Sequence, residues 1–195
     1  GLGDVYKRQS ISSASEYRPK DFNEIIGQDA IVKTLSNAID NQKIPQALLF
    51  CGPRGVGKTS CARILAKKIN DLDENFEYNI FELDAASNNS VEDIRNITEQ
   101  IRIPPQYGKF KVYIIDEVHM LSNAAFNAFL KSLEEPPAHV VFILATTEKN
   151  KIIPTILSRC QIYDFKKVDN NSIIGLLSKI CCLLYTSPSP RDTIR

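Results

Sequence analysis

The stretch GPRGVGKT, from Gly52 to Thr59, has the residue types and spacing of a phosphate-binding loop, G-x-x-x-x-G-K-[ST]. Its glycines let the backbone curl until N–H groups face a phosphate, and a following helix adds the positive end of its dipole. We expect Lys58 to reach the β- and γ-phosphates of a nucleotide and the Thr59 hydroxyl to ligate Mg²⁺. The alternative is a chance match in a glycine-rich turn, but the apolar ALLF before the loop and the helical period after it favour the functional interpretation. The predicted nucleotide-binding residues of this loop are Gly52, Pro53, Arg54, Gly55, Val56, Gly57, Lys58, Thr59 and Ser60.

An acidic pair, Asp116 and Glu117, ends the apolar run in VYIIDEVHML. Ligands of parallel α/β sheets bind at the carboxyl ends of strands. There Asp116 can hold Mg²⁺ through water, and Glu117 can polarise an attacking water as general base. Two solvated acids at a strand end are the alternative, which the phosphate-binding loop upstream makes less favoured. We expect His119 to set the local geometry and to take no part in the chemistry.

Two further positions could assist the reaction. Thr146 and Thr147 end the apolar run VVFILATT, where a hydroxyl can position water and sense a γ-phosphate, although threonine is also common in strands for its β propensity. Arg159, in SRC, precedes another short apolar run. An arginine finger stabilises charge on a transferring phosphoryl group; by itself, Arg159 would be an ordinary solvated arginine.

The elements that must position these residues alternate between strand and helix. Short apolar runs predict strands at 47–50, 80–83, 111–116, 140–147 and 161–165. Helical spacing predicts helices at 29–40, 61–69, 90–101 and 122–135, with another starting at 169. Ser90 and Ser122 are the expected N-caps, and the segment 154–160 is expected to be a turn. This alternation predicts a parallel sheet covered by helices on both faces.

Composition narrows the class of protein. The 195 residues include 43% hydrophobic and 24% charged residues, which is ordinary for a soluble globular protein, and the net charge of +1 favours no charged partner. No apolar run approaches the ~20 residues that span a bilayer, so we expect no membrane partner. The five cysteines show no CxxC spacing. We therefore expect neither zinc nor a disulfide framework, but reduced thiols in the cytoplasm.

The two ends of the chain differ from what lies between them. Residues 1–9 can be encoded by GGG CTC GGA GAT GTG TAT AAG AGA CAG. The reverse complement of these bases, read from its second position, encodes CLLYTSPSP, which is the sequence at 182–190. We therefore predict that 1–9 and 182–195 derive from one adapter read from opposite strands and exclude them from fold reasoning. A pair of natural disordered tails is the alternative.

The motifs YRPKDFNEIIGQ, GPRGVGKTS, ELDAASN, IDEVHML, LKSLEEPP, LATTE and ILSRC, taken in order, resemble one family. The resemblance covers residues 17–165 and is to the N-terminal AAA+ ATPase domain of the bacterial DNA polymerase III gamma/tau subunits. It implies an α/β fold of the P-loop NTPase class: a five-stranded parallel sheet with helices on both faces, followed by a helical lid. The implied boundaries are 10–166 for the ATPase core and 167–181 for the start of a truncated lid.

The resemblance also implies a function and partners. Such a subunit is the ATP-binding and ATP-hydrolysing motor of the clamp loader, which loads the sliding clamp onto primer–template DNA within the DNA polymerase III holoenzyme. The implied cofactors are ATP and Mg²⁺. The implied partners are the delta and delta-prime subunits, further gamma/tau copies, the sliding clamp and DNA. No base-reading motif is present, so any DNA contact should be mostly to the backbone.

The family's residue roles fall on positions already singled out. Lys58 and Thr59 match the nucleotide loop, and Asp116 and Glu117 match the acids that hold Mg²⁺ and activate water. Thr147 matches the γ-phosphate sensor. Arg159 matches the finger that acts in trans on a neighbouring subunit's ATP. The catalytic set implied by the resemblance is therefore Lys58, Glu117, Thr147 and Arg159.

Two weaker assignments follow from the resemblance. The YRP element, namely Tyr17, Arg18 and Pro19, resembles the segment that lines the adenine pocket. Lys131 resembles a family position that faces the DNA backbone. The plainer interpretation of Lys131 is an i,i+3 or i,i+4 ion pair with Glu134 or Glu135.

The sequence departs from the family pattern after the phosphate-loop helix, where many members carry a four-cysteine zinc module. Here NDLDENFEYN bridges the helix to the next strand, so we expect no zinc. Two alternative functions stay open: a non-hydrolysing scaffold similar to the delta-prime subunit, and another replication or recombination AAA+ ATPase. The intact lysine, threonine and glutamate of the predicted site argue against the scaffold.

Overall fold

A five-stranded parallel sheet forms the centre of the computed structural model, which describes residues 18–70, 76–88, 90–106 and 108–186. The strand order is β2-β3-β4-β1-β5. The two apolar strands β1 and β4 are buried along their whole length, as expected when both faces of a parallel sheet are covered. The prediction of a five-stranded parallel sheet is confirmed. The strands are β1 (Ala47–Cys51), β2 (Ile80–Asp84), β3 (Lys111–Asp116), β4 (Val140–Thr146) and β5 (Gln161–Asp164).

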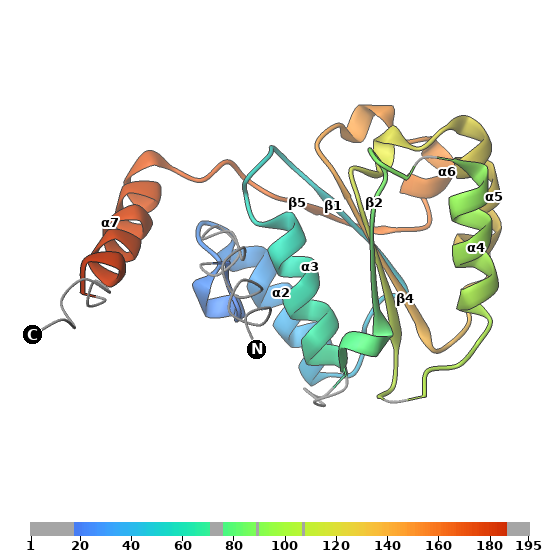
Figure 1. Ribbon diagram of the computed structural model, residues 1–195, viewed down its shortest axis with the longest axis horizontal. Helices are drawn as coiled ribbons and strands as arrows, with labels where there is room; N and C mark the ends of the chain where they lie inside the picture. The colour runs from blue at the N-terminus through green and yellow to red at the C-terminus, as the bar shows by residue number, and fades with distance from the viewer. Residues whose placement is uncertain (1–17, 71–75, 89, 107, 187–195) are drawn as a thin grey trace, which may run out of the picture.

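Helices cover both faces of this sheet (Figure 1). On one face, α2 (Asp29–Asp40) and α3 (Lys58–Ile69) pack on side chains such as Phe50 of β1. On the other face, α4 (Val91–Ile101), α5 (Asn123–Glu134) and α6 (Pro154–Leu157) pack on side chains that include Phe142 of β4. Successive strand residues point to opposite faces, so each central strand contributes to both cores. The predicted layered arrangement is therefore confirmed.

The local signals in the sequence act where they were expected, with one exception. The Ser90 side chain accepts a hydrogen bond from Asp93 N–H, and Asp93 reciprocates at the Ser90 backbone, which forms a capping box. The Ser122 side chain caps α5 by accepting from Ala125 N–H. The exception is the segment predicted as a turn, which contains α6 with Pro154 in its first turn. Proline's fixed φ suits this position.

Short 3₁₀ helices connect the larger elements. Those in the described part of the chain are η2 (Phe22–Glu24), η3 (Phe76–Asn79), η4 (Val118–Met120) and η5 (Lys149–Lys151). Of these, η4 and η5 closely follow the carboxyl ends of β3 and β4. They reverse the chain just beyond the edge of the sheet where the predicted site residues lie.

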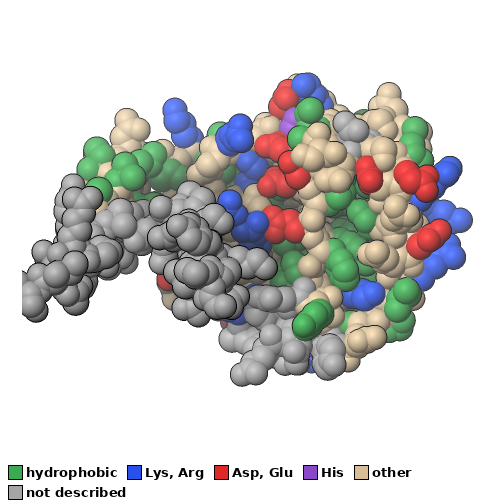
Figure 2. Space-filling view, viewed as in Figure 1, with side chains coloured by type: hydrophobic (Ala, Val, Ile, Leu, Met, Phe, Trp, Pro, Cys, Tyr) green, Lys and Arg blue, Asp and Glu red, His purple; other side chains and the backbone are tan. Residues whose placement is uncertain are grey.

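The helix α7 (Asn170–Thr186) stands away from the sheet (Figure 1). It begins one residue after the predicted start and continues through 182–186, beyond the predicted boundary at 181. Several of its apolar side chains are exposed, Ile174 most of all. Within the described residues, none of the helices has the length and apolar character needed to cross a membrane. On the face seen in Figure 2, basic and acidic side chains are interspersed, in keeping with the net charge of +1.

A close approach between Gly52 and Phe165 fixes the loop after β1 against the end of β5. Gly52 has a φ of +152°, and a Cβ atom placed on it would lie 2.6 Å from the carbonyl oxygen and 2.8 Å from the Cβ of Phe165. The Phe165 N–H donates to the carbonyl oxygen of Cys51 at 2.7 Å. Only glycine meets both requirements, the positive φ and the missing side chain.

We predict that Gly52→Ala lowers the free energy of unfolding more than Gly55→Ala does. Gly55 also has a positive φ, +79°, but a Cβ atom added there would meet nothing within 4 Å, so it controls for backbone strain alone. The added clash with Phe165 should cost about 1–3 kcal/mol beyond the control. Urea unfolding of both variants measures the difference. Equal losses would show that the end of β5 moves aside freely.

Candidate active site

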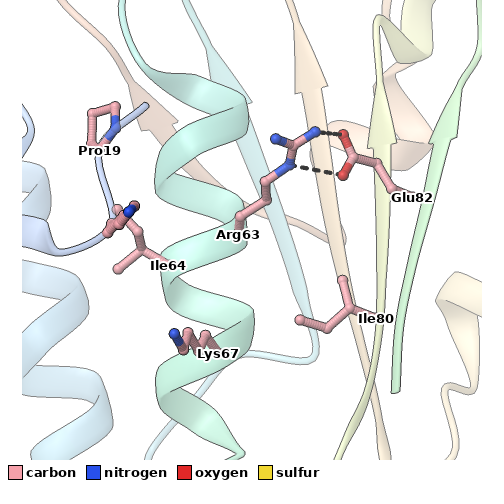
Figure 3. Close-up of a pocket in the computed structure, with 7 residues that line it drawn as sticks. Pro19, Arg63, Ile64, Lys67, Ile80 and Glu82 are labelled. Carbon is pink, nitrogen blue, oxygen red and sulfur yellow. Dashed lines mark hydrogen bonds and ion pairs between the residues drawn. The ribbon is translucent and has the colours of Figure 1, made fainter. Parts of the chain in front are cut away.

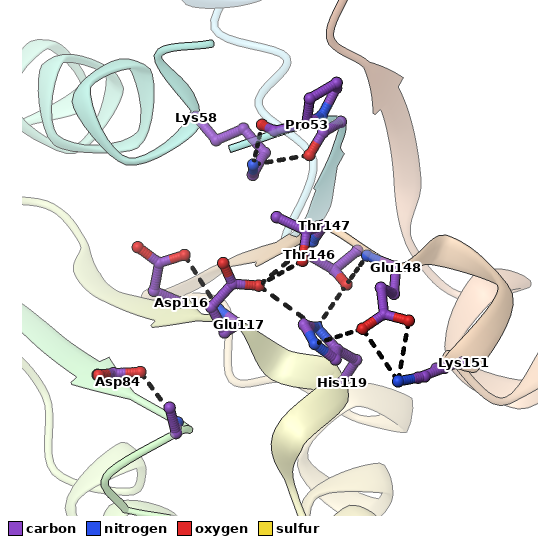
Figure 4. A network of polar contacts seen from close by, with 12 residues as sticks. Pro53, Lys58, Asp84, Asp116, Glu117, His119, Thr146, Thr147, Glu148 and Lys151 are labelled. Atoms are coloured by element: carbon purple, nitrogen blue, oxygen red, sulfur yellow. Dashed lines mark hydrogen bonds and ion pairs between the residues drawn. The ribbon is translucent and has the colours of Figure 1, made fainter. Parts of the chain in front are cut away.

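The predicted chemical residues meet because their strands are neighbours. In the order β3-β4-β1, the carboxyl ends of three strands lie side by side at one edge of the sheet. Cys51 at the end of β1 is in register with Thr146 at the end of β4. The phosphate-binding loop, the acidic pair and the threonine pair lie at these three ends, which places them together (Figure 4).

Lys58 is the buried cation of this edge. It is the first residue of α3, after Gly57, whose left-handed φ of +96° turns the loop into the helix. Its Nζ donates to the carbonyl oxygens of Gly52 at 2.8 Å and Pro53 at 2.7 Å. Burial lowers the pKa of Lys58, and the negative charges of Glu117 and Asp116 oppose that shift. An ammonium group so placed would be further stabilised by an anion at the loop.

The remaining loop residues differ in exposure. Pro53, Arg54 and Gly55 are exposed, whereas Val56 is buried in the core beneath the loop and anchors it. Ser60 is half-buried in the first turn of α3. The loop therefore has a fixed base and an accessible tip, which suits the binding of a ligand from solvent.

Thr59 and Asp116 form the second pair of the site. The Thr59 Oγ1 donates to Asp116 Oδ2 at 2.6 Å, so a hydroxyl oxygen from α3 and a carboxylate oxygen from β3 converge on one point. Magnesium binds oxygen ligands and is usually held by one or two protein groups together with phosphates and water. The two residues therefore fit the group that the sequence predicts there.

Glu117 has an unusual backbone conformation. Its φ of 48° and ψ of 44° are left-handed, which is uncommon for a residue other than glycine, and its N–H donates to Asp116 Oδ1 at 3.0 Å. Glu117 Oε2 accepts from Thr147 N–H at 3.3 Å and from Thr147 Oγ1 at 3.0 Å. The structure thus brings the predicted general base and the predicted sensor into direct contact. Strained backbone of this kind clusters at functional sites.

His119 belongs to the same network of polar contacts as Glu117 (Figure 4). Its Nδ1 is 3.0 Å from Thr146 Oγ1 and 3.4 Å from Glu117 Oε2, and its Nε2 is 3.4 Å from Glu148 Oε1. Glu148 in turn pairs with Lys151. These contacts suit the geometric role expected of His119. The contact between His119 and Glu148 could not be predicted from residue spacing, because the turns after β3 and β4 bring these two residues together.

Arg159 does not join this group. It precedes β5, whereas the residues above lie at the carboxyl ends of β1, β3 and β4, and parallel strands have their amino ends at the opposite edge of the sheet. Its Nη2 pairs with Glu134 Oε1 at 2.8 Å. Lys131 is exposed on α5, and the ion pairs found in the described part of the chain include none between Lys131 and Glu134 or Glu135. The ion pair suggested between Lys131 and Glu134 or Glu135 therefore stays a prediction, and the structure shows Glu134 in a pair with Arg159.

The predicted adenine segment is described in part. Tyr17 lies outside the described residues, and Arg18 is exposed. Pro19 lines an open pocket of about 380 Å³ along α3, together with residues that include Ile64. Figure 3 shows this pocket, whose lining includes the ion pair between Arg63 and Glu82. Neither Lys58 nor Thr59 lines it, so it lies along the flank of α3 and not at the phosphate-binding loop.

Solved structures share this fold. A DNA polymerase III gamma subunit-related protein from Thermotoga maritima aligns with a TM-score of 0.59 and 23% identity, covering 70% of this chain and 47% of the other. The Thermotoga maritima RuvB Holliday junction branch migration motor aligns with a TM-score of 0.68 and 24% identity, covering 86% and 55%. These alignments confirm the AAA+ P-loop fold.

Sequence comparisons identify more similar relatives. The DNA polymerase III tau subunit of Bacillus subtilis is 49% identical over 181 residues, and the gamma subunit of Buchnera aphidicola subsp. Baizongia pistaciae is 44% identical over 184. The Escherichia coli tau subunit is 41% identical over 195 residues. These alignments cover 84%, 86% and 91% of this chain, but only 32%, 50% and 30% of the relatives.

A family model described as "DNA polymerase III, delta subunit" matches residues 27–169. This range is most of the chain and includes the phosphate-binding loop, the acidic pair and the threonine pair. The three relatives compared above are all tau or gamma subunits. The chain therefore belongs to this family of DNA polymerase III subunits, as a gamma/tau N-terminal domain.

Proposed function

We propose that this chain is the ATP-binding and ATP-hydrolysing domain of a clamp-loader subunit. The observation that supports this most is the meeting, at one sheet edge, of a buried lysine, a threonine–aspartate oxygen pair and a glutamate held by a threonine. Each of these groups has a distinct role in phosphoryl transfer to water. The homology to gamma and tau subunits supports the choice of a clamp loader.

Nucleotide binding would begin at the loop. The ammonium group of Lys58 now rests on two carbonyl oxygens, and phosphate oxygens would offer it charged acceptors, which form shorter and stronger hydrogen bonds. The helix α3 begins at Lys58, and the N–H groups of its first turn, which lack partners within the helix, would add further donors to phosphate. The loop and Lys58 thus bind and orient the triphosphate.

Hydrolysis requires an activated water and neutralised phosphate charge. Thr59 and Asp116 would hold Mg²⁺, which when bound neutralises charge on the β- and γ-phosphate oxygens. Glu117 would accept a hydrogen bond from the attacking water and orient it towards the γ-phosphate. To do so, its carboxylate must share or release the contacts that Thr147 now makes with Oε2. Thr147 would then be free to contact the γ-phosphate or the water.

The chain's own residues weigh against the two alternative functions. A non-hydrolysing scaffold needs neither Glu117 nor the Thr59–Asp116 pair, yet all three lie together here. A recombination motor such as RuvB shares the fold, but at 24% identity the likeness extends to the fold alone. The identities of 41% and 49% are to tau subunits.

The wider assembly follows from the same proposal. The subunit would act in the cytoplasm with delta, delta-prime and further gamma/tau copies to place a sliding clamp on primer–template DNA. Arg159 would complete the ATP site of a neighbouring subunit, since it lies at the sheet edge opposite to its own loop. Lys131 is exposed on α5, which leaves it accessible to the DNA backbone.

Replacing Lys58 with alanine in the full-length subunit should abolish detectable ATP binding. Losing two or more charge-assisted hydrogen bonds to phosphate predicts an affinity loss of about 100-fold or more. Titration of a fluorescent ATP analogue measures it. Lys33→Ala, which removes the same charge from the exposed side of α2, is the control and should bind normally. Unchanged affinity in Lys58→Ala would remove the basis of the site assignment.

Replacing Arg159 with alanine should leave ATP affinity intact and reduce hydrolysis by the assembled complex about 10³-fold or more, as expected for an arginine finger. Mixed assemblies of Arg159→Ala and Lys58→Ala subunits should recover part of the activity, because the second variant supplies the finger and the first supplies an intact ATP site. Assembly is checked by size-exclusion chromatography. No recovery in verified mixed assemblies would contradict action in trans.

A further inference from the structure

Glu134 and Arg159 form an exposed ion pair that lies outside the core. The Glu134 Oε1 accepts from Arg159 Nη2 at 2.8 Å, and the side chains of Glu134 and Arg159 are 46% and 40% exposed. They are 25 residues apart in the chain and belong to different elements, the end of α5 and the turn after α6. Exposed pairs of this kind contribute little to folding stability. A role other than stability therefore needs to be considered.

The position of Glu134 is electrostatically unfavourable without its partner. It is the last residue of α5, and a negative charge there faces the negative end of the helix dipole. In the described residues, the ion pair that compensates this charge is the one with Arg159, from another element. A residue that conflicts with its local setting and is compensated by one distant group is typical of functional positions.

Both backbones are held firmly while the arginine side chain is not. Near the end of α5, Leu133 is buried in the core, and Ile156 of α6 is fully buried. The Arg159 N–H donates to the Ile156 carbonyl oxygen at 3.1 Å, which fixes the start of the side chain. Several rotatable bonds then separate this fixed point from the guanidinium, and in the described residues Glu134 is its one side-chain partner.

The hydrogen bond occupies one end of the guanidinium. Arginine carries five N–H donors in a planar fork. Glu134 engages Nη2, which leaves the donors on Nη1 and Nε available to phosphate oxygens. The carboxylate therefore restricts the rotamers of the arginine without consuming its capacity to bind a second anion.

We propose that Glu134 is the positioning residue of the arginine finger: it holds Arg159 extended from the surface, so that the remaining donors face the nucleotide of the neighbouring subunit. This inference rests on the proposed role of Arg159 in trans. Preorganisation of this kind lowers the entropy lost when the transition state forms, and small misplacements of a catalytic group lower rates by about 100-fold. Glu134 acts through Arg159 and does not itself touch nucleotide.

The test uses full-length subunits in the assembled complex, with Glu134→Ala, Glu134→Gln, Arg159→Ala and the double variant Glu134→Ala/Arg159→Ala. Glu135→Ala is the matched control. Glu135 is the next residue in the chain and the C-cap of the same helix, so this variant also removes an exposed acid. Measurements are kcat and KM for ATP, thermal midpoint, and assembly by size exclusion.

We expect Glu134→Ala to lower kcat about 10- to 100-fold, with KM for ATP and the thermal midpoint close to those of Glu135→Ala. Glu134→Gln keeps an oxygen acceptor at Oε1 and should lose less. In the Arg159→Ala background, Glu134→Ala should cause no further loss, because a residue that acts only through Arg159 has nothing left to position.

Three results would overturn the inference alone: unchanged kcat in Glu134→Ala, an increase in kcat, which would show that the pair restrains the finger, or an added loss in the double variant. Each leaves the proposed function intact as long as Arg159→Ala is inactive and is rescued in mixed assemblies. If Arg159→Ala itself hydrolyses ATP normally, the role in trans fails and the positioning role fails with it. The two failures are therefore distinguishable.

Discussion

The hydrogen bond between Thr59 and Asp116 depends on the order of the strands. Thr59 is positioned by β1 through the loop, and Asp116 ends β3, yet β1 and β3 are separated by β4. A 2.6 Å contact across an intervening strand requires the loop to reach over the end of β4, where Gly52 N–H donates to the Thr146 carbonyl oxygen at 3.2 Å. Strand order, the shape of the loop and the end of β4 are thus fixed by one another. The contact between Thr59 and Asp116 forms only when the strand order, the loop shape and the position of the end of β4 are compatible.

At the same carboxyl ends of the strands, polar groups of the site are satisfied by other groups of the protein. Burying an ammonium group or a carboxylate without partners is costly, so each charged group of the site has taken one from the protein. Lys58 rests on the carbonyl oxygens of Gly52 and Pro53, and Glu117 accepts from Thr147. These contacts are neutral substitutes for phosphate and water. A phosphate would offer Lys58 charged acceptors, which form stronger hydrogen bonds than the neutral carbonyl oxygens do.

Much of the fold could be predicted from the sequence because its signals are local. Apolar runs indicate the strands, Ser90 and Ser122 mark helix starts, and GPRGVGKT marks the loop. What depends on distant contacts could not be predicted in the same way. Helix spacing predicts Lys131, three residues away, as a partner of Glu134, whereas the ion pair of Glu134 with Arg159 joins residues 25 positions apart and cannot be predicted from spacing. Likewise, the left-handed backbone of Glu117 and the contact of His119 with Glu148 follow from the turns after β3 and β4 and leave no mark in residue spacing.

Arg159 lies too far from the other predicted site residues of its own chain to act with them. A parallel sheet has all its carboxyl ends at one edge, so a residue that precedes a strand cannot easily serve a loop that follows one. Arg159 precedes β5, the strand at one side of the sheet, while Lys58, Asp116 and Glu117 lie at the carboxyl ends of β1 and β3. Arg159 is therefore remote from the residues of its own chain that are proposed to bind nucleotide. If the residues have the proposed roles, two copies in head-to-tail contact supply each other's missing part, and hydrolysis becomes conditional on assembly. The ion pair with Glu134 then keeps a solvent-exposed arginine ordered during the interval in which no neighbour is present.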